Sequence, residues 1–102
     1  MKESDLVKSC LELLAIKKIF HYRQNSGALK TDRGGFVRFG IIGAPDIIAV
    51  ISGRYIGIEC KASKYYKQSL NQKEFQEYLE ESGGLYWLIR NIDELIDKLK
   101  NY

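Results

Sequence analysis

Two short apolar runs constrain the fold more than any other feature of this chain. Residues 46–51 and 54–61 are rich in β-branched and aromatic side chains, and only the pair Ser52-Gly53 separates them. Two such runs joined by a two-residue linker that contains glycine are typical of a β-hairpin. Both runs are almost wholly apolar, as expected of strands that are covered on both faces. The sequence therefore predicts a buried hairpin within a layered domain.

Helical spacing and turn residues predict the other elements. Apolar residues recur every three or four positions over residues 5–18, which indicates a helix with one buried stripe. Strands are expected at 20–24 and 85–89, and a second helix at 69–82, closed by Gly83-Gly84. Asn91 is expected to cap a final helix, with Glu94 completing a capping box. Residues 27–43 hold five of the nine glycines, which favours a flexible loop with room for a short strand at 36–39.

These elements follow the order α-β-β-β-α-β-α. Strands interspersed with helices indicate an α/β fold in which helices flank a mixed sheet. A chain of 102 residues has room for one core, so residues 1–102 are expected to form a single domain.

Composition excludes several classes of protein. No apolar run approaches the roughly 20 residues that span a bilayer, and the N-terminus lacks the apolar stretch of a signal peptide; we therefore expect a cytoplasmic protein. Cys10 and Cys60 lie within apolar patterns and are expected to be core residues, since two cysteines cannot form a zinc quartet. His21 is the single histidine, so no histidine-based metal cluster is possible. The net charge of +3 tolerates a nucleic-acid partner without arguing for one.

Three charged residues interrupt the apolar hairpin. Glu59 and Lys61 are two positions apart in a strand, so their side chains leave the same face. If Ile51 pairs with Arg54, Asp46 lies opposite Glu59, and if the turn is one position later, Asp46 lies opposite Lys61. Either register places Asp46, Glu59 and Lys61 on one face.

Two carboxylates paired across strands need a compensating charge. Their Cβ atoms would be ~5 Å apart, and two unit charges at that distance repel by roughly 3 kcal/mol at an effective dielectric of ~20. A divalent cation resolves this conflict, and oxygen ligands favour Mg²⁺ or Mn²⁺. A nearby lysine can then orient water or neutralise charge at a phosphate. The alternative is a structural ion pair in which Lys61 bridges both acids.

The motif also resembles a known family. Gly43-Ala44-Pro45-Asp46 followed by Glu59-Cys60-Lys61 is similar to the signature of PD-(D/E)XK nucleases, which is Pro-Asp and then Glu-x-Lys. The order of parts over nearly the whole chain resembles the VRR-NUC (virus-type replication-repair nuclease) domain. The matching parts are Glu3, residues 43–46, residues 53–61, Gln72 and Gly83-Gly84.

This resemblance implies a restriction-endonuclease-like core and hydrolysis of DNA phosphodiester bonds. It implies that Asp46, Glu59, the backbone carbonyl of Cys60 and Glu3 hold Mg²⁺ or Mn²⁺, while Lys61 positions the attacking water. Gln72 would also face the site, although Ser69 and Gln72 equally fit a capping box. The family further implies branched or structured DNA as substrate in replication, recombination or repair, a homodimer, and a phage-encoded or prophage-derived origin.

Basic residues near the open end of the hairpin are candidate phosphate contacts. They lie on two stretches, and for each one a solvated surface position is the alternative; the candidates are Lys30, Arg33, Arg38, Lys64 and Lys67. Tyr65 and Tyr66 could stack on bases or pack beneath the loop. The rival to the enzyme interpretation is a non-catalytic nucleic-acid-binding module of the same fold.

Overall fold

The computed structural model describes residues 2–24, 27–30, 32–39 and 41–102. The elements follow in chain order: α1 (Glu3–Ile16), β1 (Phe20–Arg23), β2 (Gly27–Lys30), β3 (Phe36–Phe39), β4 (Ile47–Ile51), β5 (Arg54–Cys60), α2 (Leu70–Glu81), β6 (Leu85–Ile89) and α3 (Ile92–Leu99). No helix within these described ranges is long and apolar enough to cross a membrane.

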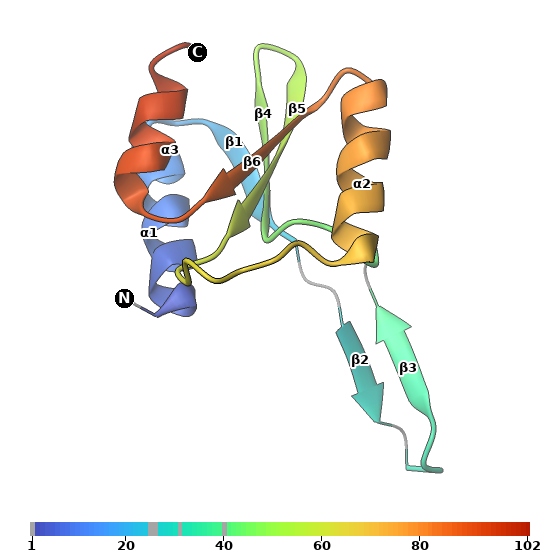
Figure 1. The fold of residues 1–102 in the computed structure, drawn as a ribbon. Coiled ribbons are helices and arrows are strands. Elements are labelled where there is room, and N and C mark those ends of the chain that lie inside the picture. The colour runs from blue at the N-terminus through green and yellow to red at the C-terminus, as the bar shows by residue number, and fades with distance from the viewer. Residues whose placement is uncertain (1, 25–26, 31, 40) are drawn as a thin grey trace.

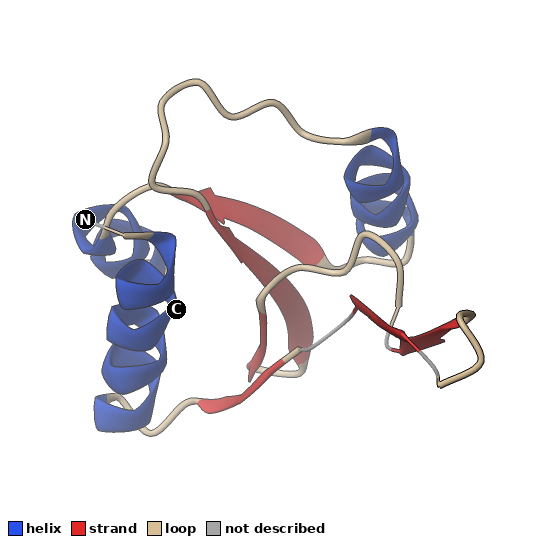
Figure 2. Cartoon of the chain, turned by 90° about the horizontal axis from the view of Figure 1, so that it is seen from below, coloured by secondary structure: helices blue, strands red, loops and turns tan. Residues whose placement is uncertain are grey.

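A four-stranded mixed sheet organises the fold. Its strand order is β1-β4-β5-β6, in which β1, β4 and β5 are antiparallel and β6 runs parallel to β5. Helices α1 and α3 lie side by side on one face, and α2 lies on the other (Figures 1 and 2). The predicted α/β class, a mixed sheet flanked by helices, is confirmed.

The central hairpin adopts the first of the two expected registers. Ile51 pairs with Arg54, and the two turn residues both have positive φ, 52° at Ser52 and 78° at Gly53. Positive φ at both positions defines a type I′ turn, whose twist matches that of the flanking strands. This register continues to Ile47 opposite Ile58, so the next residue outward on each strand brings Asp46 level with Glu59.

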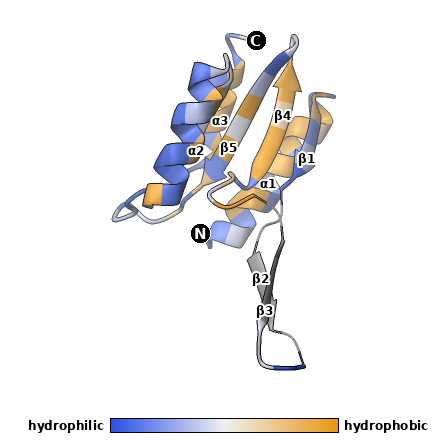
Figure 3. Ribbon diagram, turned by 90° about the vertical axis from the view of Figure 1, so that its right-hand side faces the viewer, coloured by the Kyte–Doolittle hydropathy of each residue, from blue (hydrophilic) through white to orange (hydrophobic). Residues whose placement is uncertain are grey.

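The main core lies between the sheet and the α1–α3 layer. Alternate residues of β4, β5 and β6 point to this layer and are fully buried, among them Ile47, Ile58 and Ile89. Leu6 and Leu14 of α1 meet them in the same cluster. Figure 3 shows the apolar character of β4 beside the polar helix surfaces. Because this layer fixes β4 and β5 rigidly, it also fixes the residues at their ends.

Residues 27–30 and 36–39 differ from the expected flexible loop. They form a separate antiparallel ribbon, in which β2 pairs with β3 from Gly27 opposite Phe39 to Lys30 opposite Phe36. The short strand for which the sequence left room at 36–39 is β3, whereas its partner β2 was not expected. The element order is therefore α-β-β-β-β-β-α-β-α. The apolar runs on either side of the Gly34 turn, which has a φ of 82°, favour a hairpin, whereas the number of glycines suggested a loop. The ribbon projects away from the main sheet (Figure 1).

The N-terminus of α3 departs from a full capping box. The Asn91 side chain accepts a hydrogen bond from the Glu94 backbone N–H at 3.0 Å, as predicted. The Glu94 carboxylate, however, accepts from the backbone N–H of Arg90 at 3.2 Å. An extended Asn91 backbone, with φ −153°, presents the preceding N–H to Glu94 instead of its own. The cap satisfies two backbone donors all the same.

Candidate active site

Asp46 directly precedes β4, and close packing of its neighbour Pro45 holds it there. Pro45 is fully buried against Gly57 of β5, where an added Cβ would lie 2.7 Å from Pro45 Cγ. Gly57 therefore has to lack a side chain for Pro45 to pack there. On the other side, the Asp46 carbonyl accepts a hydrogen bond of 2.8 Å from the Gln24 backbone N–H. The Asp46 side chain is thus anchored at the end of the sheet where β5 finishes.

Glu59 is a buried acid on the strand next to Asp46. Its side chain is 3% exposed, and it is the single charged residue among the buried ones in the described part of the chain. Burial first, and then the hydrogen bond and negative charge of Asp46, raise its pKa to about 9, against a smaller lowering by Lys61. Burial disfavours the charged form of an acid, and a second acid nearby adds to that effect. Asp46 and Glu59 therefore form the coupled carboxyl pair that the hairpin register predicted.

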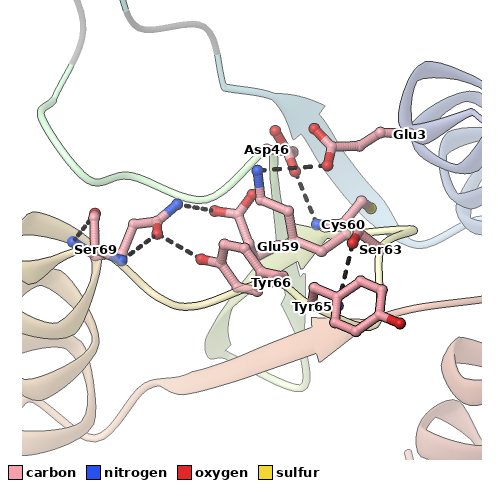
Figure 4. Close-up of polar contacts among 10 residues, drawn as sticks. Glu3, Asp46, Glu59, Cys60, Ser63, Tyr65, Tyr66 and Ser69 are labelled. Carbon is pink, nitrogen blue, oxygen red and sulfur yellow. Dashed lines mark hydrogen bonds and ion pairs between the residues drawn. The ribbon is translucent and has the colours of Figure 1, made fainter.

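Lys61 approaches these acids from the end of β5. Its Nζ lies 3.4 Å from Glu3 Oε1 in the first turn of α1 and 4.9 Å from the centre of the Tyr66 ring. Among the described residues, Lys61 forms no direct ion pair with Asp46 or Glu59, so the alternative in which it bridges both acids is not what the structure has. Figure 4 shows Asp46, Glu59 and Glu3 close to one another at this end of the sheet.

Glu3 extends the helix stripe toward the site, as the sequence indicated, but it is not buried. Its side chain remains 46% exposed, since Glu3 lies at the start of α1, before Leu6, the first core residue of that helix. The structure thus brings Glu3 to the site through Lys61. A ligand role for Glu3 would require its carboxylate to turn from the ammonium toward the Asp46–Glu59 pair.

Gln72 fulfils both of the roles that the sequence left in competition. Its Oε1 accepts a hydrogen bond of 2.9 Å from the Ser69 backbone N–H, and its own backbone N–H donates to Ser69 Oγ, which completes the capping box of α2. Its Nε2 donates to Glu59 Oε2 at 3.4 Å. One amide therefore starts a helix with its oxygen and faces the acid pair with its nitrogen.

The fit of a divalent cation depends on these carboxylates. Within the described ranges, no three His, Cys, Asp or Glu side chains form a group that could hold a metal ion. Asp46 and Glu59 nevertheless present oxygen ligands, and Asp46 raises the pKa of Glu59, a conflict that a cation would remove. The donor set suits Mg²⁺ or Mn²⁺, which need few protein ligands and retain water.

Cys60, between Glu59 and Lys61, points to the opposite face of the sheet. It is fully buried, with its Sγ 3.9 Å from Sγ of Cys10 on α1, and both thiols are free. The prediction that both cysteines are core residues is confirmed. Only the backbone of Cys60 is available to the site.

The candidate phosphate contacts divide into two groups. Lys64 and Lys67 are exposed on the connection between β5 and α2, close in sequence to Lys61. Arg33 is exposed in the turn between β2 and β3. The backbones of Lys30 and Arg38 belong to the ribbon, but their side chains lie outside the described residues, as do Asn25 and Ser26, considered as a possible lining of the site.

Tyr66 is the residue that sequence reasoning did not assign to the site. Its hydroxyl donates a hydrogen bond of 2.5 Å to Gln72 Oε1, and its ring lies beside the Lys61 ammonium. Spacing offers no signal for this contact, because residues 61–69 follow no regular period that would show which side chains turn inward.

A scan against models of protein families finds none that matches the chain, and a search among curated proteins finds no match either. The function of this chain is therefore inferred from the geometry of Asp46, Glu59 and Lys61.

Proposed function

We propose that the protein is a Mg²⁺- or Mn²⁺-dependent nuclease that hydrolyses phosphodiester bonds in DNA. The observation that carries this proposal is the convergence of Asp46 and Glu59 at one end of the sheet, with the Lys61 ammonium alongside. A buried acid pair is costly unless a cation or a proton is shared. Residues that support folding alone would gain more from an apolar pair at this position.

Each residue of the site has a role in this proposal. Asp46, Glu59 and the Cys60 carbonyl would hold the cation, and Glu3 would join them on leaving Lys61. A cation bound there would stabilise negative charge on the scissile phosphate and favour ionisation of water. Lys61 would orient the attacking water and offset the charge that develops during attack. Gln72 would keep the Glu59 carboxylate turned toward the cation through its Nε2 hydrogen bond.

The resemblance to VRR-NUC domains extends the proposal to the fold and to the DNA substrate. In this proposal the four-stranded sheet with its flanking helices is a restriction-endonuclease-like core. Branched or otherwise structured DNA, of the kind formed in replication, recombination or repair, is the proposed substrate, and a homodimer would present two sites to two strands. Lys30, Arg33, Arg38, Lys64 and Lys67 would contact phosphates, a role that makes binding strongly dependent on salt.

The test is strand cleavage on a panel of labelled DNAs that includes a linear duplex, a flap and a four-way junction, each with Mg²⁺, Mn²⁺ or EDTA. We expect metal-dependent cleavage that is lost in Asp46→Ala and Lys61→Ala. The matched controls are Asp97→Ala and Lys100→Ala, an exposed ion pair on α3. Undiminished cleavage in the site variants would identify a contaminating nuclease. Tight junction binding without any cleavage would favour the non-catalytic binding module.

A further inference from the structure

The connection between β5 and α2 returns over the end of the sheet and places Tyr66 between two residues of the candidate site. Tyr66 is half-buried, with Lys61 at its ring face and Gln72 at its hydroxyl. Figure 4 shows Tyr66 beside Glu59, on the side of the site that faces α2. Tyr66 thus contacts two residues of the candidate site, Lys61 and Gln72.

The hydroxyl of Tyr66 and the Ser69 backbone N–H together hold the Gln72 amide. Gln72 Oε1 accepts two hydrogen bonds, one from the Tyr66 hydroxyl and one from the Ser69 backbone N–H. The backbone N–H of Ser69 can only donate, so the amide oxygen has to face it, and the Tyr66 hydroxyl gives that oxygen a second donor. The Nε2 group is therefore the end that faces Glu59. Reversal of the amide would set its oxygen against a carboxylate.

The ring of Tyr66 restrains Lys61. The Nζ atom lies 4.9 Å from the ring centre, within the range of a cation–π contact, and Glu3 holds the same ammonium from α1. A flexible lysine side chain that is held from two sides loses fewer rotamers when it acts on a substrate. Tyr65 offers a contrast, since it is 80% exposed and its ring contacts Lys64 rather than a residue of the site.

We propose that Tyr66 is a positioning residue, which sets the Glu59 carboxylate through Gln72 and the Lys61 ammonium through its ring. The inference rests on the proposed nuclease function and adds to it a residue outside the resemblance motif. Tyr66 touches neither the phosphate nor the cation in this proposal. Its effect passes through two neighbours.

The kinetic test compares Tyr66→Phe and Tyr66→Leu with Tyr65→Phe and Tyr65→Leu. Removal of one hydrogen bond should lower kcat by roughly 3- to 10-fold in Tyr66→Phe. Tyr66→Leu, which also loses the ring contact, should lower kcat by at least about 30-fold. KM for DNA should stay within about twofold in both, because neither change removes a DNA contact. Equal effects at Tyr65 and Tyr66, or an effect on KM alone, would overturn the inference.

A double-variant cycle separates positioning from general destabilisation. Gln72→Met removes the amide with little change of volume, so Tyr66→Phe should have no further effect on kcat in that background. The loss caused by Tyr66→Leu should persist in part, because the Lys61 contact does not involve Gln72. Fully additive effects of Tyr66→Phe and Gln72→Met would overturn the route through Gln72.

The last test needs no activity. In ¹⁵N-labelled protein, the side-chain amide resonances of Gln72 should shift in Tyr66→Phe and remain in place in Tyr65→Phe. Unchanged Gln72 resonances in a folded Tyr66→Phe variant would overturn the inference. If wild-type protein cleaves no DNA but these resonances shift, the nuclease proposal fails alone, and the placement of Gln72 by Tyr66 is supported.

Discussion

The backbone N–H of Cys60 donates a hydrogen bond of 2.8 Å to Oδ2 of Asp46, and so joins the end of β5 to the residue that precedes β4 (Figure 4). Strand pairing alone ends at Ile47 and Ile58. The carboxylate therefore extends the ladder beyond its last backbone pair. The Asp46 carboxylate is thus both a hydrogen-bond acceptor that supports the fold and a proposed cation ligand.

This contact predicts different effects for two substitutions at Asp46. Asp46→Asn retains an oxygen that can accept from Cys60, so we expect a free energy of unfolding close to that of wild type at pH 7. Asp46→Ala leaves the buried Cys60 N–H without an acceptor and should lower the free energy of unfolding by about 1–3 kcal/mol. Urea denaturation measures both, and a more stable Ala than Asn variant would contradict the structural role.

The raised pKa of Glu59 predicts how stability depends on pH when metal is removed. The folded protein retains the Glu59 proton up to a pKa of about 9, whereas the unfolded chain releases it near 4.5. The folded state thus binds more protons between these values, and the free energy of unfolding should fall as pH rises from about 4.5 to 9. Urea denaturation in EDTA at several pH values tests this.

The matched variant for that experiment is Glu59→Gln, which cannot titrate. Its stability relative to wild type should increase as pH rises across the same interval, and the difference should level off above pH 9. A difference that stays constant with pH would show that Glu59 is ionised in the folded protein throughout.

Metal binding should release protons. A cation needs ionised carboxylates. Because its pKa is raised to about 9, Glu59 is protonated at neutral pH in the metal-free protein. Titration calorimetry with Mn²⁺ at pH 7 should be run in two buffers of different ionisation enthalpy. Release of nearly one proton makes the two binding enthalpies differ by nearly the full difference between the buffer ionisation enthalpies. Glu59→Gln should bind weakly and remove that difference.

Glu3 should influence the site more than the stability of the fold. The Glu3–Lys61 ion pair is partly exposed, and exposed pairs contribute about 0–1 kcal/mol. We expect Glu3→Gln to lower cleavage by roughly 10-fold, as loss of a residue that orients or assists the first ligands does, with little change in unfolding. Glu12→Gln, an exposed acid on the same helix, is the control, and an equal loss in both variants would argue against a role for Glu3.

The two thiols should be unreactive in the folded protein. Cys10 and Cys60 are fully buried, and the pKa of the Cys60 thiol is raised, first by the hydrogen bond that it shares with Cys10 and then by burial. Because the thiolate is the reactive form, Ellman's reagent should modify neither cysteine until denaturant is added. Rapid modification of one thiol in native protein would show that the α1–β5 contact opens.

The sequence predicted the elements that depend on local signals. Turn chemistry predicted the hairpin at Ser52-Gly53 but left two registers open. The type I′ turn of the structure selects the register that brings Asp46 level with Glu59. Strand β6 was predicted at its observed residues. These features needed no knowledge of distant contacts, because turn chemistry and the alternation of side chains define them.

Contacts made across the chain could not be predicted in the same way. The ion pair of Lys61 with Glu3 spans α1 and β5, and the Tyr66 contacts depend on the path of an irregular connection. Pattern reasoning likewise treated the two roles of Gln72 as exclusive, because spacing does not separate the oxygen of an amide from its nitrogen. Of the ribbon, only the strand at 36–39 was anticipated, since glycine suits turns between strands as well as loops.

The ribbon has a consequence for how this fold can vary. Strands β1 and β4 are already hydrogen-bonded neighbours, with Arg23 opposite Ile47, so the pairing of β2 with β3 is not needed to close the sheet. The β2–β3 segment behaves as an appendage inserted where a tight turn would suffice. Its length and composition can therefore be exchanged by design, while the acids at the base of the sheet keep their places.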